Sequence, residues 1–330
     1  MRILSAYKDG FIDPPVMKIM SHLQKTDLDF TAVVVTKREG YEFNPELMDI
    51  KGPWVLFDFI EYGWSWDQKE THLFGVNTFL DEFTKHFAFD GQWDDFDSFV
   101  RNNPPLIYFK RELLQKDMGV NALCNVLPIE YPCFYPIPEP QSFEDFCARP
   151  IDVSYLWGES HPDRVKLHIE MYRNQDFFNY HLLDNALHIE GCFRDVPAGQ
   201  RSVWLSQKIP HYARYAMEDV LMIGSASKIS VSMPGAGVKC FRHSESPINS
   251  VMVKTRDELA WSYPWKSNYN CLCPQDKERI INVCSAATND AKKLLYTIYR
   301  NGVENCRNYH IDNYIPNYVL DSIASALHDA

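Results

Sequence analysis

The chain has 330 residues, of which 45% are hydrophobic and 23% charged, a composition typical of a folded globular protein with room for two domains. Its formal net charge of −11 disfavours broad attraction to nucleic acid or to acidic membranes. No apolar run approaches the roughly 18 residues of a membrane span, and the first residues do not form a signal peptide. We therefore expect a cytoplasmic location and no membrane partner.

The first part of the chain predicts a parallel α/β sheet. Strands are expected over residues 2–7 and 30–36, with a helix over 16–24 between them, which is the order of a right-handed crossover unit. The run 30–36 is continuously apolar, as in strands that are buried on both faces. Further strands are predicted over residues 55–60, 106–109 and 125–129.

A proline-rich segment separates two predicted domains. Six prolines fall between residues 128 and 150, and this density limits regular structure. We therefore place the first domain at residues 1–148 and the second at residues 149–310. The last residues, 311–330, are expected to form an amphipathic helix that either closes the second domain or returns to the first.

The second part of the chain predicts another sheet with helices between its strands. Strands are expected over residues 151–157 and 186–190, and helices over 212–223 and 276–300. The last of these helices is expected to end at Gly302, because glycine commonly follows the end of a helix.

The loop after the strand 151–157 is a candidate anion site. Ser160 is a typical N-cap residue with Pro162 in the first turn, so a helix N-terminus is expected to face the ligand crevice. Arg164 and His161 are the basic residues of this loop. A surface ion pair is the alternative for Arg164.

The stretch 229–253, ISVSMPGAGVKCFRHSESPINSVMV, carries the strongest functional pattern. Apolar and serine residues alternate up to Pro234, as in a strand. Gly235 and Gly237 then permit a tight turn whose N–H groups point the same way, a backbone nest that suits an anion. Lys239 and Arg242 follow the turn, and two fixed cations beside such a nest are what a diphosphate needs.

This pattern resembles the donor half of glycosyltransferases with the GT-B architecture, in particular the exostosin-like and spore-maturation-type members. Their C-terminal domain carries a strand, a glycine turn, one or two basic residues, then Arg and Glu, here Arg242 and Glu245. The resemblance implies an α/β fold of two Rossmann-like domains that face each other across a cleft. Many retaining members repeat a Glu eight positions after the first, where this chain has Val253, so the stereochemical outcome stays open.

The resemblance also implies a substrate and a set of residues. The substrate is a nucleotide-diphosphate sugar, used without a metal or another cofactor. The donor-binding residues would be Gly235, Gly237, Lys239, Arg242, His243, Ser244 and Glu245, with Arg164 and His161 from the earlier loop. The cations would neutralise the leaving diphosphate, and Glu245 would orient sugar hydroxyls.

The catalytic candidates come from their placement after strands. Asp58 and Glu61 lie near the end of the strand 55–60, where open α/β sheets place their ligand crevice. Proton removal from an acceptor hydroxyl needs a carboxylate or a histidine, so one of the two is our predicted base, with Asp13 and His72 as substitutes. A hydrogen-bonded loop carboxylate is the alternative for Asp58 and for Glu61.

Two alternative functions stay open. The acceptor could be a hydroxymethylated DNA base, as in viral enzymes of this architecture, instead of a glycan or a small molecule, although the net charge of −11 disfavours a surface that follows a duplex. The second alternative is a non-catalytic protein of the same fold that binds a nucleotide or a sugar.

Overall fold

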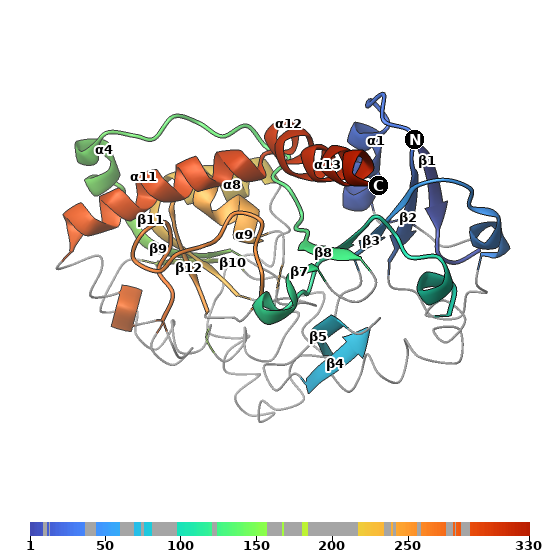
Figure 1. The fold of residues 1–330 in the computed structure, drawn as a ribbon. Helices are drawn as coiled ribbons and strands as arrows, with labels where there is room; N and C mark the ends of the chain where they lie inside the picture. The colour runs from blue at the N-terminus through green and yellow to red at the C-terminus, as the bar shows by residue number, and fades with distance from the viewer. Residues whose placement is uncertain are drawn as a thin grey trace, which may run out of the picture.

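The structure is a computed structural model, and it contains two parallel sheets that lie side by side in two lobes (Figure 1). The first lobe is built on the sheet of residues 2–128 and the second lobe on the sheet of residues 151–254. The described residues are 1–8, 12, 14–36, 44–59, 69–73, 76–80, 98–120, 124–156, 167, 180–183, 217–233, 239, 242–255, 259–274, 280, 282–284 and 291–330. Within these ranges, no helix has the length and apolar character that a bilayer crossing requires.

The first lobe contains a six-stranded sheet in the order β1-β2-β3-β6-β8-β7. Its strands are β1 (Arg2–Ser5), β2 (Thr31–Val35), β3 (Trp54–Asp58), β6 (Ile107–Lys110), β7 (Gly119–Val120) and β8 (Asn125–Pro128). All neighbouring strands are parallel except β7 and β8. Every residue of β2 and β3 is buried, which confirms the prediction of a central strand covered on both faces.

Shorter elements surround this sheet. The helix α1 (Pro14–Leu23) connects β1 to β2, as predicted, and a separate antiparallel pair is formed by β4 (Lys69–Leu73) and β5 (Val76–Leu80). Two 3-10 turns, η1 (Pro45–Asp49) and η2 (Gln115–Asp117), belong to its loops. The proline-rich segment that connects the two sheets contains one short helix, α4 (Phe143–Cys147), which lies beside the second lobe (Figure 1).

The second lobe contains a four-stranded parallel sheet in the order β10-β9-β11-β12. Its strands are β9 (Ile151–Leu156), β10 (Tyr180–Leu183), β11 (Ser227–Ser232) and β12 (Val251–Lys254). The helix α8 (Met217–Ser225) precedes β11, and α9 (Arg242–Glu245) with the 3-10 turn η5 (Ser246–Ile248) lies between β11 and β12. The strand predicted over 186–190 lies outside the described residues, and β10 was not predicted.

The long helix α11 (Lys292–Tyr309) corrects one prediction, because it continues through Gly302 instead of ending there. A Cβ atom at this position would lie 2.9 Å from the backbone oxygen of Asn270. The glycine therefore permits a close approach between α11 and the segment after β12, and it does not terminate the helix.

The chain ends in three short helical pieces that cover the first lobe: α12 (Ile311–Tyr314), the π-helical turn η7 (Ile315–Leu320) and α13 (Asp321–Asp329). Figure 1 shows α11 running over the second lobe and the final helices lying beside α1. Pro316 lies in the π-helical turn, where it has no N–H to donate.

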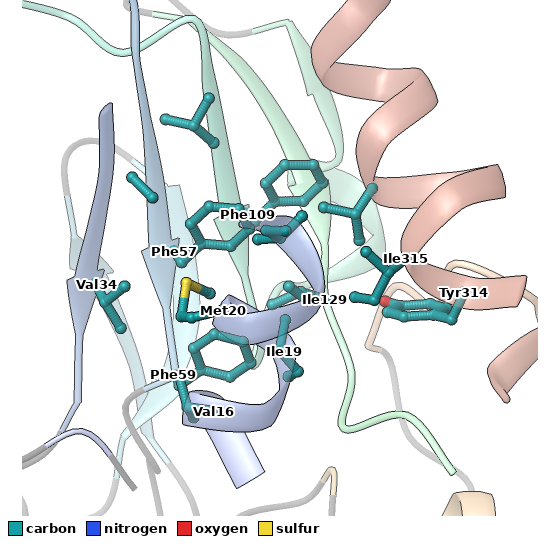
Figure 2. Close-up of a cluster of buried hydrophobic side chains, with 14 of the residues drawn as sticks. Val16, Ile19, Met20, Val34, Phe57, Phe59, Phe109, Ile129, Tyr314 and Ile315 are labelled. Atoms are coloured by element: carbon teal, nitrogen blue, oxygen red, sulfur yellow. The ribbon is translucent and has the colours of Figure 1, made fainter. Parts of the chain in front are cut away.

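Apolar contacts hold these final helices to the first sheet, as Figure 2 shows. The same cluster contains residues of α1, of strands β2, β3 and β6, and of the final helices, among them Ile19, Met20, Val34, Phe57, Phe109, Tyr314 and Ile315. The Phe57 and Phe109 rings stack with centroids 5.2 Å apart. The end of the chain is therefore part of the core of the first lobe, and it crosses the boundary between the lobes a second time.

Candidate functional site

A buried ion pair lies at the carboxyl ends of β3 and β6. Asp58 and Lys110 are register partners on these neighbouring strands, and the Lys110 Nζ atom lies 2.9 Å from Asp58 Oδ2. The Tyr108 hydroxyl donates to the same oxygen at 2.6 Å. Burial lowers the pKa of Lys110, while the Asp58 charge opposes that shift. Asp58 was a candidate base, but its carboxylate is only 1% exposed and already accepts these two hydrogen bonds.

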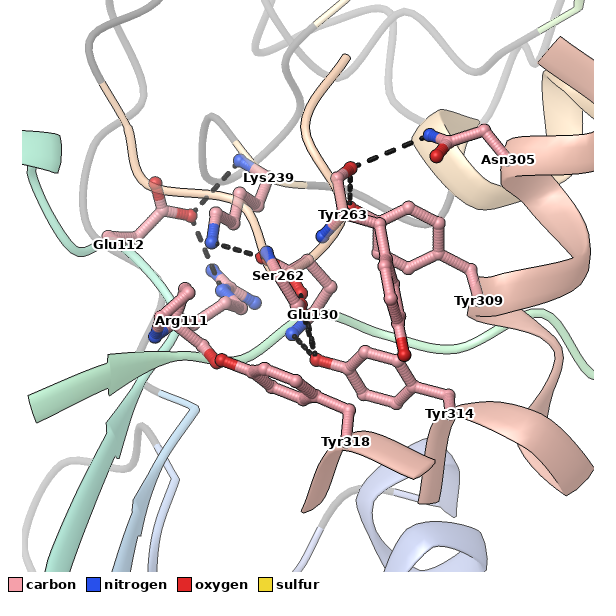
Figure 3. Close-up of polar contacts among 11 residues, drawn as sticks. Arg111, Glu112, Glu130, Lys239, Ser262, Tyr263, Asn305, Tyr309, Tyr314 and Tyr318 are labelled. Carbon is pink, nitrogen blue, oxygen red and sulfur yellow. Dashed lines mark hydrogen bonds and ion pairs between the residues drawn. The ribbon is translucent and has the colours of Figure 1, made fainter. Parts of the chain in front are cut away.

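Glu130, which follows β8, is a second buried carboxylate at this end of the sheet, and it is 3% exposed. Figure 3 shows Lys239, Ser262 and Tyr314 converging on it. Ser262 donates its hydroxyl to Oε2 and its backbone N–H to Oε1 at 3.3 Å. Tyr314 donates its hydroxyl to Oε2 at 2.8 Å and accepts the Glu130 backbone N–H at 3.0 Å. Glu130 therefore joins the first sheet, the segment after β12 and the C-terminal helices.

Lys239, the first cation of the predicted donor motif, reaches this carboxylate from the second lobe. Its Nζ atom lies 2.6 Å from Glu130 Oε1, and the side chain is 2% exposed. Its backbone N–H donates to Glu112 Oε1 at 3.2 Å, so Lys239 has two contacts with the first lobe. The ammonium also lies 4.9 Å from the centre of the Trp261 ring. The structure thus places Lys239 between the lobes and not on an outer face.

Further buried charges from the first lobe surround this contact. Arg111 and Glu112 come directly after β6, and both side chains are fully buried. The Arg111 Nε atom lies 3.3 Å from Glu112 Oε1, and Arg111 Nη1 donates to the Tyr131 hydroxyl at 2.9 Å. Such a concentration of buried charge is expensive unless the groups are paired, and it commonly marks a functional site.

The next motif residues line a small cavity at the same junction. His243 and Ser244 of α9 are each 4% exposed, and the His243 ring lies 5.2 Å from that of Trp261. The cavity has a volume of about 10 Å³, enough for about one water molecule. Its lining comes from both lobes: Glu130, Tyr131, Lys239, His243, Ser244, Trp261, Trp265 and Tyr309.

The structure brings together only part of the predicted site. Glu245 ends α9 and is half-buried. Arg242 is the first residue of α9, and His72 lies in β4. The other predicted site residues lie outside the described residues; they are Asp13, Glu61, His161, Arg164, Gly235 and Gly237. Their roles stay predictions.

Among the described side chains, no three His, Cys, Asp or Glu groups converge as they would around a metal ion. Cys271 and Cys273 are not joined in a disulfide, and Cys271 is buried. The described part of the junction offers ammonium, guanidinium, imidazole and hydroxyl groups, which suit an oxygen-rich anion, together with the carboxylates of Glu112 and Glu130.

The sequence reasoning missed Glu130, Ser262 and Tyr314. A signal existed for Glu130, because it follows a predicted strand just as Asp58 does, and side chains after neighbouring parallel strands share one edge of the sheet. The prolines between residues 128 and 150 instead predict that Glu130 belongs to the crossing between the domains. No local pattern identifies Ser262 or Tyr314.

Comparison with known proteins places the chain by its fold. No protein-family model matches it, and no curated protein matches its sequence. Among solved structures, a UDP-forming α,α-trehalose-phosphate synthase from Burkholderia vietnamiensis superposes with a TM-score of 0.55 at 10% identity, covering 94% of this chain and 78% of the other. Alr3699/HepE from Anabaena, in complex with UDP and glucose, gives 0.53 at 10% identity, covering 94% and 81%.

A sucrose-phosphate synthase from Thermosynechococcus elongatus gives a TM-score of 0.51 at 12% identity, covering 94% of this chain and 77% of the other. These neighbours have the GT-B fold, and this chain shares it: an α/β protein of two Rossmann-like domains that face each other across a cleft. The fold predicted from the sequence is confirmed. The narrower likeness to exostosin-like and spore-maturation-type members stays a prediction.

Proposed function

We propose that the protein is a glycosyltransferase that moves a sugar from a nucleotide-diphosphate sugar to an acceptor hydroxyl. The observation that carries the proposal is the position of Lys239, a buried cation that follows a strand of the second lobe and reaches the first lobe. In open α/β sheets, ligands bind beyond the carboxyl ends of the strands. A cation between two such edges suits a diphosphate held in the cleft.

The donor phosphates would be bound by Lys239 and Arg242, with the N–H groups of the turn from Gly235 to Gly237 beside them. These fixed positive groups would stabilise the negative charge that develops as the nucleoside diphosphate leaves, without a metal ion. Glu245 would accept hydrogen bonds from the sugar. Solved structures of the same fold support this assignment, since Alr3699/HepE was solved with UDP and glucose, and a trehalose-6-phosphate protein from E. coli with UDP-2-fluoro glucose.

The acceptor side is assigned to the first lobe. Glu61, Asp13 and His72 remain candidate bases, whereas Asp58 would have to leave Lys110 and Tyr108 before it could take a proton. This engagement of Asp58 is the one observation that favours a second candidate, a protein of the same fold that binds a nucleotide sugar without transferring it.

The test is a binding and turnover assay on the Arg242→Ala variant. We expect the wild type to gain thermal stability with UDP, GDP or ADP and to hydrolyse the matching nucleotide sugar slowly. Arg242→Ala should lose both properties and stay folded. Arg2→Ala is the matched control, because Arg2 forms an exposed pair with Glu46 at the start of β1.

Each outcome separates the candidates. Loss of turnover in Arg242→Ala but not in Arg2→Ala supports the glycosyltransferase. Binding of a nucleoside diphosphate with no hydrolysis and no transfer in the wild type would favour the non-catalytic protein. Unchanged turnover in Arg242→Ala would remove the proposed donor site.

A further inference from the structure

Glu130 has no spare hydrogen-bonding capacity in this structure. A carboxylate offers about four lone-pair sites. Oε1 accepts from Lys239 Nζ and from the Ser262 backbone N–H, and Oε2 accepts from the hydroxyls of Ser262 and Tyr314. This full set of donors explains how a charged carboxylate can be 3% exposed.

Three of these hydrogen bonds do not involve Lys239. Ser262 gives two of them and Tyr314 the third, and Tyr314 also accepts the Glu130 backbone N–H at 3.0 Å. Burial and the Glu130 charge raise the pKa of Tyr314 well above its usual value, so its hydroxyl stays a donor. The carboxylate would therefore remain fixed and hydrogen-bonded if the Lys239 ammonium moved away.

The cavity that the described residues leave beside the Lys239 ammonium is too small for a phosphate group. The adjoining cavity of about 10 Å³ accommodates about one water molecule. Glu130 Oε1 lies 2.6 Å from Lys239 Nζ, and the centre of the Trp261 ring lies 4.9 Å from the same nitrogen. A phosphate that takes the position of Glu130 on Lys239 therefore exchanges one anionic partner of the ammonium for another.

We propose that the Glu130 carboxylate is an internal competitor for the donor site, occupying on Lys239 the place that a phosphate of a nucleoside diphosphate takes. This inference rests on the proposed function and adds a residue that controls ligand entry. Because the pair joins the two lobes, the exchange also releases one of the contacts between them. An uncharged ligand cannot replace the carboxylate, so the contact selects for anions.

Glu130→Gln is the variant that isolates this competition. The amide keeps the shape and one oxygen for Lys239, and the hydroxyls of Ser262 and Tyr314 can rotate to accept from its NH₂ group. The negative charge that competes with phosphate is removed. Glu130→Asp shortens the side chain by one methylene group and so moves the carboxylate away from Lys239. This second variant tests the same competition if Glu130→Gln does not fold.

The experiment is calorimetric titration of the full chain with the best-binding member of UDP, GDP and ADP. Glu130→Gln should bind the diphosphate about tenfold more tightly than the wild type, and Glu130→Asp should show a smaller gain in the same direction. The corresponding uncharged nucleoside should bind equally to all three proteins. Adding Lys239→Met to Glu130→Gln should abolish the gain.

Two failures are distinguishable. If the wild type binds a diphosphate and Glu130→Gln binds it equally or more weakly, the competition is overturned while the proposed function stands. If neither the wild type nor any variant binds a diphosphate, the proposed function falls together with the inference.

Discussion

Two buried ion pairs at the edge of the first sheet have similar geometry and different positions in the fold. Asp58 and Lys110 lie 2.9 Å apart on neighbouring strands of one sheet, in register with each other. Glu130 and Lys239 lie 2.6 Å apart but come from different lobes, 109 positions apart in the chain. The strand pairing that forms β3 and β6 also brings the first pair together, whereas the second depends on how the lobes meet.

Burial alone does not assign a role to a charged residue. Removing Asp58 or Lys110 leaves the charge of the other residue buried within the first sheet. Removing Lys239 leaves a carboxylate that still accepts three hydrogen bonds from Ser262 and Tyr314. The pair within the sheet is therefore structural, and the pair between the lobes can open to admit a ligand.

The largest effect is expected from Lys110→Met. The variant would leave the Asp58 carboxylate buried with Tyr108 as a remaining donor, which typically costs about 3–5 kcal/mol of unfolding free energy. Urea denaturation measures the loss. Adding Asp58→Asn removes the stranded charge and should recover part of it. A loss below about 1 kcal/mol in the single variant would contradict the structural role of this pair.

Lys239→Met is expected to cost less, about 1–3 kcal/mol, because Glu130 keeps its other donors. The same urea experiment compares it with Lys110→Met directly. The double variant with Glu130→Gln has no buried charge at this position and should regain most of the loss. A cost equal to that of Lys110→Met would show that the two pairs do not differ as we infer.

A smaller effect is expected from the tyrosines that pack at the junction. Burial, with the Glu130 charge as the second cause, raises the pKa of Tyr309 and Tyr314 well above the usual value. In the unfolded chain these hydroxyls lose their protons near pH 10. Their contribution is therefore fully present below about pH 10, and stability should fall above it by about 1.4 kcal/mol per pH unit for each tyrosine.

Urea unfolding at about pH 9 and about pH 11 checks this expectation. Tyr314→Phe should show a shallower fall than the wild type. Tyr269→Phe is the control, because Tyr269 is 57% exposed, and its fall should match that of the wild type. An equal fall in all three proteins would show that Tyr314 does not titrate as its burial requires.

The sheets could be predicted from the sequence because their signals are local. The apolar run of β2 and the alternation that ends β11 each depend on neighbouring residues only, and both strands are present. Lys239 was also predicted from its local pattern, as a cation after a glycine turn. Local sequence patterns of this kind predict helices, strands and the residues that follow the end of a strand.

The junction could not be predicted because its contacts are not local. The partners of Glu130 are 109, 132 and 184 positions away in the chain, and no periodicity relates them. The predicted end of the helix at Gly302 was wrong for a similar reason. This glycine permits a close approach to Asn270 and does not end α11. Both the partners of Glu130 and the glycine within α11 depend on contacts between segments that are far apart in the chain.

The most direct measurement is a crystal structure of the protein with the nucleoside diphosphate that binds best. We expect the diphosphate in the cleft between the lobes, with a phosphate oxygen within about 3 Å of Lys239 Nζ and the Glu130 carboxylate detached from that ammonium. A ligand bound elsewhere, with the contact between Glu130 and Lys239 still at 2.6 Å, would contradict it.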